Sequence, residues 1–152
     1  MARLNYLKAA PDGTKALGAL HSYIRNSGLS PVLIDLVYLR ISLINGCAYC
    51  IDTHTQDLLK AGVPQAKITL LPVWHEAEAL FDERERAALA WSETVTLVAE
   101  THIPDADFAA ARAVFNEKEL ADLTIAIGLM NAYNRLAIGF RSTPPSAKQA
   151  KT

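Results

Sequence analysis

The chain has 152 residues, of which 51% are hydrophobic and 20% charged, and its formal net charge is -1 at pH 7. This length suits one domain with a substantial core, and the weak charge provides no basic field, which excludes nucleic-acid binding. The first residues lack an apolar segment of signal-peptide length, and no apolar run approaches about 18 residues, so we expect no membrane segment and a cytoplasmic location.

Apolar residues recur with helical spacing along most of the chain, and glycines, prolines and capping residues separate the segments. No alternating strand pattern bounded by turn signals is present. The sequence therefore predicts an all-α protein of about six to eight helices. The predicted helices cover approximately residues 12–26, 31–44, 47–61, 64–71, 74–80, 82–98, 104–115 and 117–140.

The segment 31–44 is apolar around nearly its whole circumference, which predicts a buried helix. Its conspicuous polar residues are Asp35 and Ser42, seven residues apart and therefore on one face. A buried carboxylate is costly unless it is paired or protonated. Burial would raise the pKa of Asp35 and make it a candidate proton donor or acceptor. The simpler alternative is a salt bridge to an arginine such as Arg40 or Arg135.

The two cysteines, Cys47 and Cys50, form a C-x-x-C pair just after the break at Asn45 and Gly46. On a helix, Cys50 and His54 are an i,i+4 pair, and Cys47 lies about one turn earlier, near the helix N-terminus. A helix N-terminus and a nearby imidazolium both favour thiolate over thiol. The pattern therefore predicts a reactive dithiol that can form a Cys47–Cys50 disulfide.

Other interpretations of the pair are inert thiols, a structural disulfide, or a zinc site that also uses His54 and Asp35. Three ligands within eight residues of one helix make closed tetrahedral zinc geometry difficult. Attack of a thiolate on a peroxide needs no Lewis acid. We therefore expect no metal and no bound cofactor.

Residues Leu33 to His54 resemble the core motif of the AhpD-like alkylhydroperoxidase group in the carboxymuconolactone decarboxylase superfamily. The family pattern is approximately E-x4-R-x-S-x2-N-x-C-x2-C-x3-H, and the chain matches it from Arg40 to His54. The segments 81–91 and 131–135 are also similar to smaller family members. The chain departs from the pattern at Asp35, where the family usually has Glu, and at Tyr49, where the best-known members have a second His.

The resemblance implies a helical domain over residues 1–141, with the C-x-x-C pair at a helix N-terminus and assembly into trimers or hexamers. It also implies a thiol-dependent alkyl hydroperoxide reductase with an antioxidant role. In that cycle Cys50 is peroxidatic, Cys47 is resolving, and His54 and Asp35 relay protons. An external thiol, such as a dihydrolipoyl group, would reduce the disulfide. The composition of residues 142–152 separately predicts a loosely ordered tail.

The sequence leaves alternatives for the attacking sulfur and for the class of function. Helix-start electrostatics favour Cys47 rather than Cys50 as the attacking sulfur. A non-catalytic redox sensor or thiol-disulfide exchange protein is the alternative function, whereas decarboxylation gives two adjacent thiols no role. We further expect Met130 and Tyr133 to fill the core and His75 to lie on the surface. Six residues are expected to support the reactive site: Ser42, Tyr49, Arg40, Asn131, Asn134 and Arg135.

Overall fold

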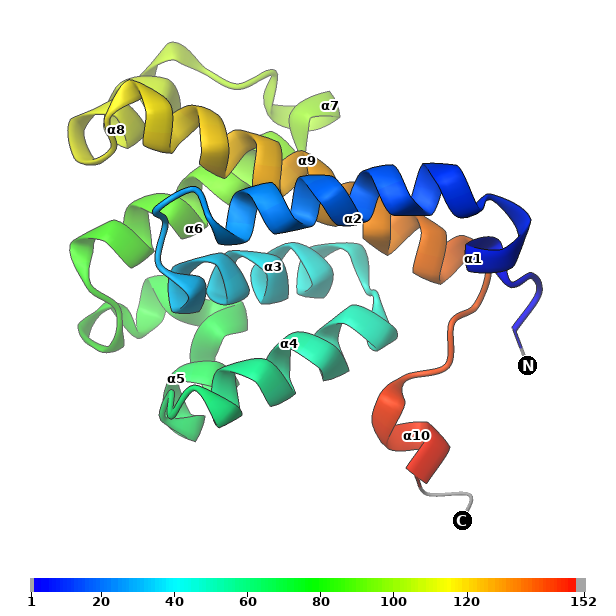
Figure 1. Cartoon of the computed structure of the whole chain (residues 1–152). Helices are drawn as coiled ribbons and strands as arrows, with labels where there is room; N and C mark the ends of the chain where they lie inside the picture. The colour runs from blue at the N-terminus through cyan, green and yellow to red at the C-terminus, as the bar shows by residue number, and fades with distance from the viewer. Residues whose placement is uncertain (1, 150–152) are drawn as a thin grey trace.

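The computed structural model describes residues 2–149 of the chain, and the fold over this range is entirely helical (Figure 1). Within this range, ten α-helices and two 3-10 helices replace the predicted six to eight. Three of them, α1, α7 and α10, are single short turns without the periodicity that marks the longer helices, and the two short helices predicted over residues 64–80 are three elements, α5, η1 and η2. The elements are α1 (Tyr6–Ala9), α2 (Pro11–Arg25), α3 (Pro31–Asn45), α4 (Ala48–Lys60), α5 (Gln65–Leu70), η1 (Leu71–Glu76), η2 (Glu78–Leu80), α6 (Glu83–Thr96), α7 (Val98–Thr101), α8 (Asp105–Val114), α9 (Glu117–Gly139) and α10 (Pro145–Gln149).

The long helices begin and end close to the predicted residues because their caps are encoded locally. Asp82 and Glu85 form a capping box at the start of α6, and Asn116 and Glu119 form another at the start of α9. Gly46 ends α3 in the left-handed conformation, with φ of 69°, which glycine adopts without a steric penalty.

Helix α3 lies at the centre of the fold and packs against α4, α6 and α9 (Figure 1). Its apolar residues enter two clusters on different faces: Ile34, Val37 and Tyr38 in one, Leu36 and Leu39 in the other. All five side chains are at most 1% exposed. Since full burial of such a side chain is worth about 1.5–3 kcal/mol, contacts on both faces explain why α3 has no polar stripe. The predicted buried helix is confirmed.

The segment after α9 lies beside the first part of α4 (Figure 1). The Asp52 carboxylate accepts a backbone N–H bond and a hydroxyl bond from Ser146, both 2.7 Å long, which fix α10 against α4. The segment expected to be a loosely ordered tail thus contains a held helix, and its residues 150–152 lie outside the described residues. Across residues 2–149, no helix combines the length and apolarity that a bilayer span requires.

Candidate active site

The turn between α3 and α4 places the cysteines at the start of α4, as the sequence predicts. The Cys47 N–H donates to the Ser42 carbonyl at 2.9 Å across Gly46. Cys47 then takes the N-cap position of α4, and its own carbonyl accepts the N–H of Ile51 at 2.9 Å. Cys50 is therefore in the first turn, near the positive end of the helix dipole.

The two thiols are free, and their sulfur atoms lie 2.8 Å apart. Cys47 is 1% exposed and Cys50 is 5% exposed. Donation of the Cys50 S–H to the other sulfur lowers the pKa of Cys47 to about 7, although burial opposes this shift. The same contact, together with burial, raises the pKa of Cys50. The pair therefore loses one proton near neutral pH and shares the second between its sulfur atoms.

A buried amide network supports this thiolate from α9. The Asn134 side chain, fully buried, lowers the pKa of both thiols by hydrogen bonding. Its amide N–H donates to the Ser42 hydroxyl at 3.0 Å, and its carbonyl accepts from Asn45 at 2.9 Å. Asn45 also donates to Asn131 at 3.0 Å. Arg135 is exposed and donates to Asn131, so it joins the outer end of the network.

His54 and Asp35 meet across the α3–α4 contact. The His54 Nδ1 atom is 3.2 Å from a carboxylate oxygen of Asp35, and the ring packs edge-on against Tyr38. An imidazole that uses Nδ1 to donate to a carboxylate has Nε2 available as a base. Arg25 of α2 holds the same carboxylate through bonds of 2.6 and 3.1 Å.

Asp35 does form the salt bridge to an arginine that was the simpler alternative, but the two arginines named for it and the expected rise of its pKa are wrong. Its partner is Arg25, whereas Arg40 donates to Glu93 at 2.7 Å and Arg135 bonds to Asn131. Burial does act to raise its pKa, but hydrogen bonds from His54 and Arg25 outweigh burial and lower the pKa of the carboxyl. Asp35 is therefore an ionised partner of His54 at neutral pH.

Cys50 and His54 line one cavity of about 290 Å³ between α2, α4 and α9. Its other walls are mainly aromatic and apolar, and they include Met130 and Tyr133, which pack in or against the core as predicted but also border the cavity. His21 of α2 faces it as well. Burial and the positive charge of Arg25 lower the pKa of His21. A small organic molecule with a reactive polar end fits this type of lining.

The sequence did not identify His21, Arg25 or Tyr6 as site residues. All three precede α3, and no spacing rule connects them to the cysteines. Tyr6 and His21 reach the cavity because α2 packs against α9 and α1 packs against α2 (Figure 1). Arg25, at the other end of α2, reaches the site through its bonds to Asp35.

The zinc site that was the alternative interpretation, with Cys47, Cys50, His54 and Asp35 as ligands, is not assembled among the described residues. Among residues 2–149, the ligand atoms that gather within 4.8 Å of one another belong to Asp35, His54 and Asp57, without the cysteine sulfurs. The Asp35 oxygens of that group are already bonded to Arg25 and His54.

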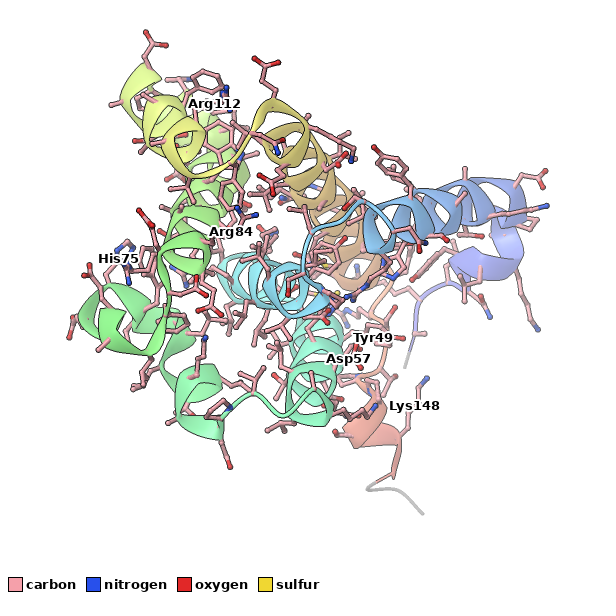
Figure 2. All side chains as sticks on the ribbon, turned by 60° about the vertical axis from the view of Figure 1, so that its left-hand side comes forward. Tyr49, Asp57, His75, Arg84, Arg112 and Lys148 are labelled. Atoms are coloured by element: carbon pink, nitrogen blue, oxygen red, sulfur yellow. The ribbon has the colours of Figure 1, made fainter. Side chains whose placement is uncertain are left out.

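A second carboxylate cluster lies away from the cysteines. Glu93 accepts from Arg40 and Trp74, each at 2.7 Å, and contacts His75 at 3.2 Å. The His75 side chain is 58% exposed, which confirms it as a surface residue, and it appears far from Tyr49 in Figure 2. Arg40 therefore supports the packing of α3 against α6 rather than the thiols.

Residues 11–94, more than half of the chain, match the carboxymuconolactone decarboxylase family. The chain belongs to this family. The matched region contains α2, α3 and the C-x-x-C helix, and so includes Arg25, Asp35, both cysteines and His54.

Individual relatives agree with this assignment. A crystal structure from Agrobacterium tumefaciens, described as a protein of unknown function with a suggested antioxidant defence role as AhpD, has a TM-score of 0.91 and 44% identity, covering 95% of this chain and 99% of that one. The uncharacterised protein YdfG of Bacillus subtilis is 34% identical over 90% of this chain and 92% of its own length. Alkyl hydroperoxide reductase AhpD of Streptomyces griseus is 40% identical over 43% of this chain, and the match spans 38% of that enzyme. The family and the AhpD-like fold are thus shown.

Proposed function

We propose that the chain is a thiol-dependent hydroperoxide reductase that cycles between a Cys47–Cys50 dithiol and a disulfide. The observation that carries the proposal is the joint placement of Cys50 and His54 in one cavity, with the Cys47 sulfur 2.8 Å from the Cys50 sulfur. An attacking sulfur, a base and a second sulfur within bonding reach are the groups that such a cycle needs.

In the first step, His54 Nε2 accepts the proton that Cys47 releases, and the proton of Cys50 then passes to Cys47 across 2.8 Å. The Cys50 sulfur, now a thiolate, attacks the terminal oxygen of the hydroperoxide. The S–O bond forms as the O–O bond breaks, and the leaving alkoxide takes the proton from His54. One thiol and one hydroperoxide become a sulfenic acid and an alcohol. Asp35, ionised and bonded to Nδ1, stabilises the imidazolium that forms in between.

In the second step, the Cys47 thiolate attacks the Cys50 sulfenic sulfur. The S–S bond forms and hydroxide leaves, which becomes water with the proton that Cys47 released. Two equivalents of an external thiol, or one dithiol such as a dihydrolipoyl group, then restore both cysteines by thiol-disulfide exchange.

The choice between the two sulfurs is testable because they differ in surroundings. Cys50 shares the cavity with His54, whereas the lowered pKa favours charge on Cys47. We assign the attack to Cys50 for two reasons. Its proton has to cross only 2.8 Å to reach the Cys47 thiolate, and Cys50 lines the cavity that a peroxide would enter. A sulfenate-specific trap added with peroxide to Cys47→Ser should label Cys50, as located by mass spectrometry. A label on Cys47 in Cys50→Ser, with none on Cys50 in Cys47→Ser, would reverse the assignment.

Steady-state turnover tests the proposal against its alternative, a stoichiometric redox sensor or exchange protein. With excess dihydrolipoamide and tert-butyl hydroperoxide, the enzyme should consume many equivalents of peroxide per subunit. Cys47→Ser and Cys50→Ser should each abolish sustained turnover. Oxidation that stops after one equivalent per subunit in the parent protein would support the sensor.

We also propose that the chain forms a homo-oligomer. Large apolar side chains remain exposed on several helices, among them Leu7 at 60% and Phe108 at 50%. Such side chains are common where subunits meet. Light scattering coupled to size exclusion should report a trimer or hexamer, and a monomer at micromolar concentration would contradict this.

A further inference from the structure

The two cysteines, which are 1% and 5% exposed, border different cavities. Cys50 lines the cavity that contains His54, whereas Cys47 lines a second cavity of about 440 Å³. Tyr49 and Ala137 line both, so they form the wall between the two spaces. Although the sulfur atoms are 2.8 Å apart, a molecule that approaches Cys47 need not pass through the Cys50 cavity.

The second cavity has two sides that come from distant parts of the chain. Gly46, Cys47 and Ala48 of the α3–α4 turn form one side, and the segment 141–144 after α9 forms the other. Figure 2 shows Tyr49 near the C-terminal segment that carries Lys148. The segment 141–144 is fixed at both ends, by α9 and by the Asp52–Ser146 bonds that hold α10 on α4, so the cavity is formed before any ligand arrives.

Arg141 is the charged residue of this lining, and it is exposed. It follows the end of α9 with φ of 52°, and its N–H and that of Ser142 bond to the Ile138 and Ala137 carbonyls. This is the position of a helix C-terminal motif where glycine is usual, since a side chain is disfavoured at positive φ. A long cationic side chain therefore lies beside the Cys47 cavity at a backbone position where the local geometry favours glycine.

We propose that this second cavity receives the reducing thiol, that Arg141 binds an anionic group on that thiol, and that reduction begins at the Cys47 sulfur. The proposal rests on the proposed function only in taking the Cys47–Cys50 disulfide as the oxidised state. The preferred reductant is an anionic thiol, of which 3-mercaptopropionate is the simplest probe, whereas a neutral thiol such as dihydrolipoamide would enter the same cavity without the contact to Arg141. Peroxide and reductant then use separate entrances on opposite sides of Tyr49.

Two successive thiol-disulfide exchanges reduce the protein disulfide. The thiolate of the reductant attacks the Cys47 sulfur, an S–S bond forms between them, and Cys50 leaves as a thiolate that takes a proton from His54. A second thiolate attacks the reductant's sulfur in this mixed disulfide and releases Cys47 as a thiolate. Two thiols are oxidised to one disulfide, and the protein disulfide is reduced to two thiols.

The test measures reduction of the disulfide, prepared with diamide so that it needs no peroxidase activity. The probes are 3-mercaptopropionate and neutral 2-mercaptoethanol, and the variants are Arg141→Gly and the control Arg3→Ala. Arg141→Gly relieves the backbone at this position and should fold at least as well as the parent. Arg3 is an exposed cation that bonds to the Gly139 carbonyl at the same end of α9, outside the lining.

Arg141→Gly should slow reduction by 3-mercaptopropionate about two- to fivefold relative to 2-mercaptoethanol, the scale of one exposed ion pair. Added salt should shrink the difference. Arg3→Ala should change the ratio of the two rates little, and oxidation by tert-butyl hydroperoxide should be unaffected by Arg141→Gly. Rapid alkylation during reduction should label Cys50, with the probe attached to Cys47.

Three results would overturn the proposal: equal slowing with both probes, an equal effect of Arg3→Ala, or a mixed disulfide located on Cys50. None of these depends on peroxide turnover. A protein that passes this test but reduces no peroxide would refute the proposed function alone and would point to thiol-disulfide exchange.

Discussion

Two carboxylates, one on α3 and one on α6, each contact one arginine and one histidine, but the two histidines have different surroundings. Asp35 is bonded to Arg25 and His54, and Glu93 is bonded to Arg40 and His75. In both, burial acts to raise the carboxyl pKa, and hydrogen bonds outweigh it and lower the pKa. The carboxylate, arginine and histidine combination therefore does not by itself identify a reactive site.

The two sites differ in what surrounds the histidine ring nitrogen that does not contact the carboxylate. His54 is 7% exposed and borders the cavity that contains Cys50. The His75 side chain is 58% exposed and stacks on Trp74 with ring centres 3.6 Å apart. Only the first imidazole has a nucleophile and an enclosed space within reach. The comparison supplies a matched control for each group in the proposed proton relay.

The largest difference is expected between the two histidines. His54→Asn should lower the rate of peroxide oxidation of the dithiol about 10²- to 10⁴-fold, because a positioned acid and base is lost. His75→Asn should leave the rate within about twofold, since ring contacts of an exposed side chain contribute little. Stopped-flow measurement of tryptophan fluorescence or thiol loss gives both rates. Equal effects of the two changes would remove His54 from the mechanism.

The next largest difference is expected between the two carboxylates. Asp35→Asn should lower the oxidation rate about 10²-fold if it orients and charges His54, whereas Glu93→Gln should change the rate little. Both should lower the free energy of unfolding, by about 1–3 kcal/mol, because each leaves a partly buried arginine without its charge partner. Asp35→Glu should recover much of the rate, since the resemblance implies Glu as the usual residue here. A folded Asp35→Asn protein with undiminished turnover would show that the Asp35 pair is structural, like that of Glu93.

The pH dependence of oxidation should separate thiol ionisation from the carboxylates. Because the pKa of Cys47 is lowered to about 7, the oxidation rate should rise through pH 7 and level off about one unit above it. Below pH 6 it should fall about tenfold per unit, as expected for a single proton. Glu93→Gln should reproduce this profile. A rate that keeps rising to pH 9 would mean that the shared proton does not lower the pKa of the pair.

The smallest effect concerns stability in acid. Both carboxyls have folded pKa values below their unfolded values of about 3.9 and 4.3, so the unfolded state binds more protons as the pH falls. Their stabilisation is present above about pH 5 and is lost as the pH drops through the folded pKa. Urea unfolding at pH 7 and pH 3.5 should show a smaller dependence on pH than in the parent, by at most about 0.7 kcal/mol in Asp35→Asn and about 1.2 kcal/mol in Glu93→Gln. An unchanged dependence in either variant would contradict the ionised pair at that site.

The sequence by itself determined the helices whose signals are local. Gly46 determines the break after α3, and the capping boxes at Asp82 and Asn116 determine where α6 and α9 begin. The apolar circumference of residues 31–44 determines the burial of α3. Each of these signals acts within a few residues. The pairing of Cys47, Cys50 and His54 followed for the same reason, because all three lie within about two turns of one helix. Ser42 lies about 20° from Asp35 around α3 and was correctly placed on its face.

Only the tertiary structure decided which charges pair and which cavity each sulfur enters. Arg40 is five residues after Asp35 and so points about 140° away around the helix, which leaves it to Glu93, while Arg25 reaches Asp35 from α2. Arg141 and Ser146 come within reach of the cysteine helix because α10 folds back onto α4, almost one hundred residues later in the chain. Contacts of this kind depend on how helices pack rather than on the spacing of residues within them. The reactive pair could therefore be found from local sequence, and its surroundings could not.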